Sequence, residues 1–261
     1  MVATLVVTAV LAPVLAPHDP QLIPTGEEAT TLAPPSPRHV LGTDVLGRDL
    51  LSRVLYGSRV SLLVGLGVAV IAATLGCLVG LVAGYCGRWV DAVLMRATDV
   101  VMAFPSLVLA IGLIAVFEEP GLDKVFVVLI ALGWTTIARL VRGEVLAVKN
   151  LDYVQAARAL GVSNAAIALR HVLPNCLAPL LVAATLGIGS NMVAEAGLSF
   201  LGLGAQSPTL SWGAMLAEGQ TFLGSAPWVA VFPGLGLLTA VLGVNLLGDG
   251  LRDLLDPRFR R

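Results

Sequence analysis

Charged residues are scarce in this sequence. Only 13% of its 261 residues are charged, and only two of them are lysines, Lys124 and Lys149. Soluble domains carry charge on about 25% of their residues, so this composition, with 57% hydrophobic residues and a mean hydropathy of +0.89, excludes an ordinary soluble domain. The net charge of −1 argues against a nucleic-acid-binding surface. We therefore expect an all-α integral membrane protein.

Cysteine and catalytic motifs are also scarce. The three cysteines, Cys77, Cys86 and Cys176, lie in or beside apolar segments, with a spacing that favours neither a disulfide framework nor a zinc site. No G-x-x-x-x-G-K-[ST] sequence occurs, so the chain lacks that route to ATP binding. The H-E-x-x-H, G-x-G-D and G-x-S-G patterns of membrane hydrolases are absent too. We expect no catalytic residue, cofactor or metal ion.

Hydrophobic runs predict about six membrane spans. A spanning helix needs about 17–25 apolar residues. The fourth run is short and can span only if its flanking Trp134 and Arg139 lie near the interface. The first run could instead be a signal peptide, but it lacks a basic start and its prolines fit a cleavage site poorly. The predicted spans are Met1–Pro17, Val60–Gly87, Val100–Phe117, Val125–Ala138, Val172–Ala194 and Ala226–Gly248.

Small residues recur every fourth position in the second span, at Ala72, Gly76, Gly80 and Gly84. Such a stripe lets another helix approach closely. The partner could be a helix of the same chain or of another subunit.

Four residues are candidates for a pathway or a gate. Pro105, after Phe104 in the third span, predicts a kink or break of the kind that often lines a cavity or moves. Asn191 and Glu195 lie near the end of the fifth span. Glu195 could contact an outer gate, or it could be a hydrated interfacial carboxylate or helix cap.

The segment between the first two spans is polar and rich in proline until Leu41–Gly65. There, Thr43 or Asp44 could cap a short interfacial helix. Its apolar positions would include Leu50, Leu51, Val54 and Leu55.

A long polar, helix-forming block, residues 139–179, separates the fourth and fifth runs. Val145–Leu160 is rich in Ala, Leu and Val, which predicts a helix. Gly161 is expected to end it at positive φ. Ser163 can then cap a second short helix, Asn164–Val172. The block therefore predicts two helices that meet at a glycine bend and form a rigid projecting knob.

The sequence AARALGVSNAAIALRHVLPN within this block resembles the EAA loop of importer-type ABC permeases. Ala156, Ala157, Gly161, Leu173 and Pro174 occupy the signature positions, while Gln155 stands where the family has an acidic residue. Pro174 is also expected to end the second short helix. The resemblance implies an ATPase-docking surface formed by Tyr153, Gln155, Ala156, Ala157, Gly161, Ser163, Asn164, His171, Leu173 and Pro174.

Three further segments resemble one particular subunit type within this family. Leu41–Gly65, Glu195–Leu216 and the final LLGDGLRDLLDPRFRR are similar to the C-type subunit of dipeptide, oligopeptide and nickel permeases. The similarity covers residues 41–261. It implies a type I ABC importer permease fold of about six transmembrane helices. The implied organisation is a first helix and extracytoplasmic segment (1–57), a transmembrane domain (58–251) with its coupling loop (143–176), and a tail (252–261).

The same resemblance implies the partner subunits and the transported cargo. These would be a homologous B-type permease, two ABC ATPase subunits or a fused ATPase, an extracytoplasmic substrate-binding protein and the lipid bilayer. ATP and Mg²⁺ would sit on the ATPases and not on this chain. Dipeptides or short peptides would be the cargo, with nickel or haem as the alternative.

Basic residues predict the orientation. Eleven of the sixteen lie in one set of segments, which the positive-inside rule assigns to the cytoplasm with both termini. The eleven are Arg88, Arg96, Arg139, Arg142, Lys149, Arg158, Arg170, Arg252, Arg258, Arg260 and Arg261; the others are Arg38, Arg48, Arg53, Arg59 and Lys124. The chain is thus expected in the bacterial inner (plasma) membrane.

A secondary transporter or a channel without an ATPase is the rival hypothesis. A secondary transporter usually shows inverted repeats and ionisable groups at mid-membrane. The two halves of this sequence show no repeat, and no carboxylate lies at the centre of a predicted span. Nothing in it resembles a channel filter.

Overall fold

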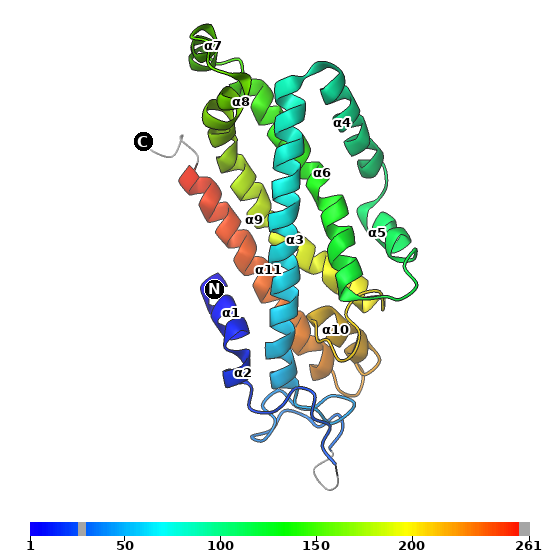
Figure 1. The fold of residues 1–261 in the computed structure, drawn as a ribbon. Helices are drawn as coiled ribbons and strands as arrows, with labels where there is room; N and C mark the ends of the chain where they lie inside the picture. Colours follow the sequence, from blue (N-terminus) through cyan, green and yellow to red (C-terminus); the bar gives the residue numbers. More distant parts are fainter. Residues whose placement is uncertain (26–29, 256–261) are drawn as a thin grey trace. The chain divides into compact units, whose positions relative to one another are not determined.

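The computed structural model describes residues 1–25 and 30–255, and the regular structure of these residues is helical (Figure 1). One isolated β-bridge joins Thr43 and Asp49. The helices are α1 (Val2–Val10), α2 (Ala12–Leu15), α3 (Leu50–Cys86), α4 (Arg88–Met102), α5 (Ser106–Ile114), α6 (Leu122–Val148), α7 (Asp152–Ala159), α8 (Asn164–Ile167), the π-helix η2 (Ala168–Val172), α9 (Leu173–Phe200), α10 (Trp212–Gln220) and α11 (Trp228–Leu255).

The all-α prediction is confirmed, with a smaller number of long helices than expected. Among the described residues, four helices are long and apolar enough to cross a membrane: Leu50–Cys86, Leu122–Val148, Asn164–Phe200 and Trp228–Leu255. The bent pair α4 and α5 makes a fifth if it counts as one span. The predicted first span is divided into α1 and α2, of nine and four residues.

Two long helices extend beyond the predicted spans. The expected interfacial helix at Leu50 is instead the first part of α3, which runs without a break for 37 residues. α6 continues past Ala138 and ends only at Val148. Uninterrupted helices keep their backbone groups paired internally, and several polar residues in these stretches have partners of their own.

Two of those partners explain why charge does not end α6. Arg142 donates from Nε and Nη2 to the two carboxylate oxygens of Asp91, with 2.6 Å between Nη2 and Oδ2. Arg139 Nη2 donates to Asp99 Oδ1 at 2.5 Å. Both acids belong to α4, which therefore pairs with α6.

The predicted break at Pro105 is confirmed. α4 ends at Met102 and α5 begins at Ser106, and the two helices are bent by 87°. Proline has no backbone N–H and its ring clashes with the preceding turn, so the helix stops before it.

The prediction that Pro174 ends the second short helix is wrong. η2 passes directly into α9, and Pro174 is the second residue of that helix. In η2 the Leu173 N–H donates to the Ala168 carbonyl, five residues back. The wider π-turn relieves the crowding that proline would cause in a regular α-helix.

The chain divides into two compact units. Unit 1 comprises Met1–Leu66, Ile111–Val128 and Ile188–Val244, and unit 2 comprises Gly67–Ala110, Leu129–Gly187 and Asn245–Arg261. A core around Trp212 lies in unit 1, and its buried members are Leu50, Met192, Trp212, Met215 and Ala240. The core of unit 2 joins α3, α6, α7, α8 and α9 through residues that include Leu81, Val141, Val154, Ile167 and Cys176.

The small-residue stripe packs within the chain, against α6. A Cβ at Gly76 would lie 2.6 Å from the Trp134 carbonyl oxygen, and one at Gly80 would lie 2.5 Å from that of Ala138. Contacts this short exclude any side chain unless a backbone moves. The stripe therefore serves the close approach of α3 and α6 inside unit 2.

We expect Gly80→Ala to destabilise the protein. The added methyl meets backbone and the Val141 Cβ at 2.9 Å, and overpacking costs about 1–3 kcal/mol. Gly143→Ala in α6 is the matched control, because nothing lies within 4 Å of its Cβ position. Alanine there should be neutral or stabilising by up to about 1 kcal/mol. Thermal unfolding in detergent should rank the variants in that order; equal midpoints for Gly80→Ala and wild type would contradict the packing.

Candidate functional site

The predicted glycine bend is confirmed. Gly161 follows α7 with φ +79°. Its N–H donates to the Arg158 carbonyl at 3.0 Å, and the Val162 N–H donates to the Ala157 carbonyl at 3.1 Å. These two bonds form a Schellman motif, in which a left-handed residue closes the end of a helix.

The start of the second helix is also as predicted. Ser163 Oγ accepts a hydrogen bond from the Ala166 N–H at 3.4 Å, which caps α8. Next to the cap, Tyr85 of α3 donates its hydroxyl to Asn164 Oδ1 at 3.0 Å. α8 itself is only four residues long, because η2 and α9 continue the chain.

The base of the knob is fixed by a buried core and a polar cluster. Val154 and Ile167 are fully buried among the apolar residues of unit 2. The Tyr153 hydroxyl donates to the His171 carbonyl at 3.3 Å. Asn175 Nδ2 donates to that hydroxyl at 3.0 Å and to the same carbonyl at 2.7 Å. α7 is therefore tied to the start of α9.

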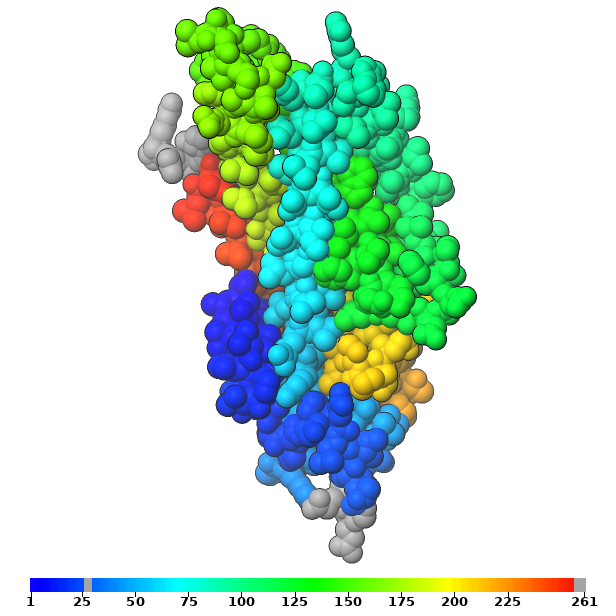
Figure 2. All heavy atoms as spheres, in the orientation of Figure 1, coloured from blue at the N-terminus to red at the C-terminus, as the bar shows by residue number. Residues whose placement is uncertain are grey.

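The outer side of the knob is open. α7 and α8 form a lobe at the surface in Figure 2. Leu160, which directly follows α7, is 84% exposed. Sequence reasoning did not single out Leu160, although a large apolar residue next to the terminal glycine was the available signal. Of the predicted docking residues, Ala157 is buried and His171 and Leu173 are partly buried; Tyr153, Gln155, Ala156, Gly161, Ser163, Asn164 and Pro174 are exposed.

Gln155, the departure from the family signature, hydrogen-bonds locally. Its side-chain amide nitrogen donates to the Lys149 carbonyl at 3.3 Å. Lys149 in turn donates from Nζ to the Gly84 carbonyl at 2.6 Å, near the end of α3.

The four candidate pathway residues are not one cluster within a unit. Phe104 and Pro105 are exposed at the α4–α5 break and belong to unit 2. Asn191 and Glu195 belong to α9 and unit 1. Their role in a pathway remains a prediction.

Of the alternatives for Glu195, the hydrated carboxylate at the end of a span is wrong. α9 continues to Phe200, and Glu195 is 0% exposed. Oε1 accepts from Ser199 Oγ at 2.7 Å, and Oε2 accepts from Ser61 Oγ of α3 at 3.4 Å. The serines accept in turn from backbone N–H groups of Ala205 and Trp212. Glu195 is thus the centre of a buried network that joins α9, α3 and the start of α10.

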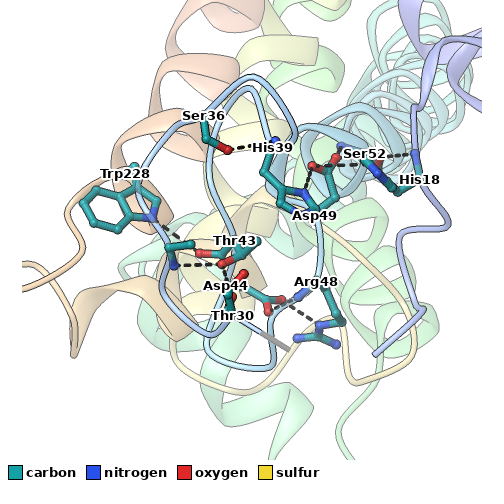
Figure 3. Close-up of polar contacts among 11 residues, drawn as sticks. His18, Thr30, Ser36, His39, Thr43, Asp44, Arg48, Asp49, Ser52 and Trp228 are labelled. Carbon is teal, nitrogen blue, oxygen red and sulfur yellow. Dashed lines mark hydrogen bonds and ion pairs between the residues drawn. The ribbon is translucent and has the colours of Figure 1, made fainter. Parts of the chain in front are cut away.

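Unit 1 also contains a closely hydrogen-bonded loop before α3 (Figure 3). Asp44 Oδ1 accepts from the N–H groups of Leu46 and Arg48, at 2.8 and 2.9 Å, and Arg48 Nε donates to Oδ2 at 2.6 Å. The Thr43 hydroxyl donates to the Thr30 carbonyl at 2.7 Å. Thr43 and Asp44 therefore shape the loop and do not cap the helix.

The helix cap is Asp49. Its Oδ2 accepts from the Ser52 N–H at 2.9 Å. Burial raises the pKa of this carboxyl, but hydrogen bonds from His39 and Ser52 outweigh burial and hold the pKa below its usual value. Nearby, Arg53 is buried and donates from Nη2 to Glu218 Oε2 of α10 at 2.9 Å. Sequence reasoning missed both residues. Glu218 is far from Arg53 in the chain, whereas the cap at Asp49 has a local partner three residues later that was an available signal.

The long helices, the broken pair and the two-helix knob define a membrane permease of the ABC importer type. A chain of the MetNI methionine ABC transporter, in an inward-facing structure, has the same fold, with a TM-score of 0.60 over 79% of this chain and 98% of that one, at 18% identity. The chain belongs to the family described as binding-protein-dependent transport system inner membrane component, which it matches over residues 76–261.

Curated relatives cover most of the chain. A dipeptide transport system permease, DppC, of Alkalihalophilus pseudofirmus is 44% identical over 87% of this chain and 74% of its own length. A di/tripeptide permease, DppC, of Pseudomonas aeruginosa is 43% identical over 98% and 85%. A glutathione permease, GsiD, of Pectobacterium atrosepticum is 44% identical over 87% and 75%.

We expect the Glu195 network to be needed for stability. Glu195→Ala leaves buried serine hydroxyls without an acceptor and a cavity beside them, which costs about 2–3 kcal/mol. Glu195→Gln keeps the shape of the side chain and one acceptor oxygen, and should therefore destabilise the protein less than Glu195→Ala. The thermal midpoint in detergent measures both, with the exposed Val193→Ala on the same helix as control. If Glu195→Gln is as stable as wild type but does not transport, the carboxylate has a role in transport beyond packing.

Proposed function

We propose that this permease forms half of the translocation pathway for dipeptides or other short peptides. The family establishes a permease subunit of an ATP-driven importer. The three relatives described above are named for dipeptides, di- and tripeptides, and glutathione, which are all short peptides. Their identities of 43–44% over most of the chain favour the same cargo class over nickel or haem.

The observation that carries the proposal is the knob of α7, Gly161 and α8. It has an exposed outer side, a fixed bend and a buried base, which are the properties of a rigid coupling element. In the proposed arrangement, two ABC ATPase subunits, or a fused ATPase, bind ATP and Mg²⁺ and hold this knob. A homologous permease would complete the pathway, and an extracytoplasmic binding protein would deliver the peptide.

Movement of the ATPases would then pass through the knob into the long helices. The knob is held to α9 by Tyr153 and Asn175 and to the core by Val154 and Ile167. A displacement of α7 would therefore move α9 as well, because these contacts connect the two helices directly. The helices would alternate between inward-open and outward-open arrangements as nearly rigid bodies.

Gly161→Val tests the coupling role. Nothing lies within 4 Å of a Cβ at this position, so valine does not clash with the core. The cost is backbone strain of about 1 kcal/mol or more, because φ is positive. We expect near-normal abundance in the membrane, while peptide uptake and transport-linked ATP hydrolysis fall together and the ATPases co-purify poorly.

Gly161→Asn is the matched control, because asparagine tolerates the left-handed conformation far better than a β-branched residue. It should retain most of the uptake. Wild-type uptake and assembly in Gly161→Val would show that the block is only a connector. If the wild-type transporter couples normally but takes up a different class of cargo, the peptide assignment is overturned and the coupling role is not.

Labelling of single cysteines tests the orientation. Both Thr30 and Asn164 are exposed, and the charge distribution places them on opposite sides of the membrane. The native cysteines, of which Cys86 is exposed, must first be replaced. A membrane-impermeant maleimide should then label Thr30→Cys from outside in intact cells, and Asn164→Cys only after the membrane is opened. Labelling of both from the same side would contradict the proposed orientation.

A further inference from the structure

Three potential metal ligands converge in the loop before α3, although their sequence positions gave no sign of it. His18 follows α2, His39 lies in the middle of the loop, and Asp49 caps α3 (Figure 3). One donor atom from each lies within 4.8 Å of the other two. The chain has only three histidines, and two of them meet here.

The distances suit a tetrahedral site. His39 Nδ1 lies 2.9 Å from Asp49 Oδ1, and His18 Nδ1 lies 3.6 Å from the same oxygen. Nitrogen and oxygen ligands about 2.0–2.2 Å from a zinc ion are about 3.3–3.6 Å apart at tetrahedral angles. The two distances to Asp49 Oδ1 are therefore within a few tenths of an ångström of that range, and the two histidine donors lie within 4.8 Å of each other.

The surrounding hydrogen bonds orient the donors. Ser52 donates from N–H and Oγ to Asp49 Oδ2, at 2.9 and 2.8 Å, and leaves Oδ1 directed at the two imidazoles. The same Ser52 Oγ accepts a hydrogen bond from the backbone N–H of His18 at 3.1 Å. The backbone N–H of His39 donates to Ser36 Oγ at 3.1 Å. Metal-binding residues are commonly held by such outer partners.

An unpartnered buried atom supplies a second, independent observation. His18 Nδ1 is inaccessible to solvent and has no hydrogen-bond partner. Buried polar atoms rarely stay unpaired, and an ion is one of the usual reasons when they do. The atom faces Asp49 Oδ1, the position that a bound cation would share.

From these observations we propose that His18, His39 and Asp49 bind one divalent transition-metal ion of the zinc class. Two imidazole nitrogens and one carboxylate oxygen are a ligand set that zinc accepts. Each imidazole would bind through Nδ1 and keep its proton on Nε2. Water would have to supply the fourth ligand. The ion would clamp the loop to the start of α3.

Metal titration of the full chain tests the site. The protein is purified in detergent with a tag that contains no histidine and is stripped of metal with a chelator. Zn²⁺ competition against a chromogenic chelator should give one ion per chain, and Co²⁺ should give the strong visible absorption of a tetrahedral site. Zn²⁺ should also raise the thermal midpoint.

Variants decide whether these three residues are the ligands. His18→Gln and His39→Gln should each weaken zinc binding at least about tenfold, and Ser52→Ala should weaken it by about 10- to 100-fold. His171→Gln, at the only other histidine, is the matched control and should bind as wild type. Thermal unfolding without metal checks that His18→Gln is folded.

The substitution His18→Cys distinguishes ligation from a structural effect. A thiolate is itself a zinc ligand, so this variant should regain binding and add a sulfur-to-cobalt charge-transfer band. The proposal is overturned if wild type shows no saturable binding of Zn²⁺ or Co²⁺ at micromolar concentration. It is equally overturned if binding persists unchanged in both glutamine variants, because the ion would then be on another part of the chain.

Discussion

The close approach of α3 and α6 is the constraint on which unit 2 depends. Apolar helices gain little from burying apolar surface when their surroundings are equally apolar, so contact at short range must hold them together. Gly76, Gly80 and Gly84 make that contact because they have no side chain. The knob residues Val154 and Ile167 belong to the core that this contact forms, so the proposed coupling element depends on the same packing.

Polar groups in the helices are placed where they find partners. Arg139 and Arg142 of α6 pair with acids of α4, and Glu195 of α9 receives two serine hydroxyls. An unpaired charge in an apolar helix costs several kcal/mol, so these pairs also fix which helices can be neighbours within each unit. The unit 1 loop follows the same rule, since Asp44 and Asp49 collect its backbone and side-chain donors.

Proline and glycine residues have different effects on the helices of this chain. Pro105 separates α4 from α5 and Gly161 separates the two short helices of the knob, while Pro174 follows a π-turn and interrupts no helix. The difference lies in the surrounding backbone. At Pro174 the preceding turn is widened in η2, whereas α4 ends three residues before Pro105. Proline and glycine positions therefore indicate where a break can occur, and the local packing determines whether it does.

The sequence by itself determined the class of protein, the all-α fold, the bend at Gly161, the cap at Ser163 and the break at Pro105. Each follows from composition or from residues a few positions apart, whose conformational preferences act locally. Tertiary structure alone decided the lengths of α3 and α6, the burial of Glu195, the pairing of Arg53 with Glu218 and the meeting of His18, His39 and Asp49. Those features depend on side chains that are far apart in sequence, and no local preference specifies which of them will be neighbours once the helices have packed.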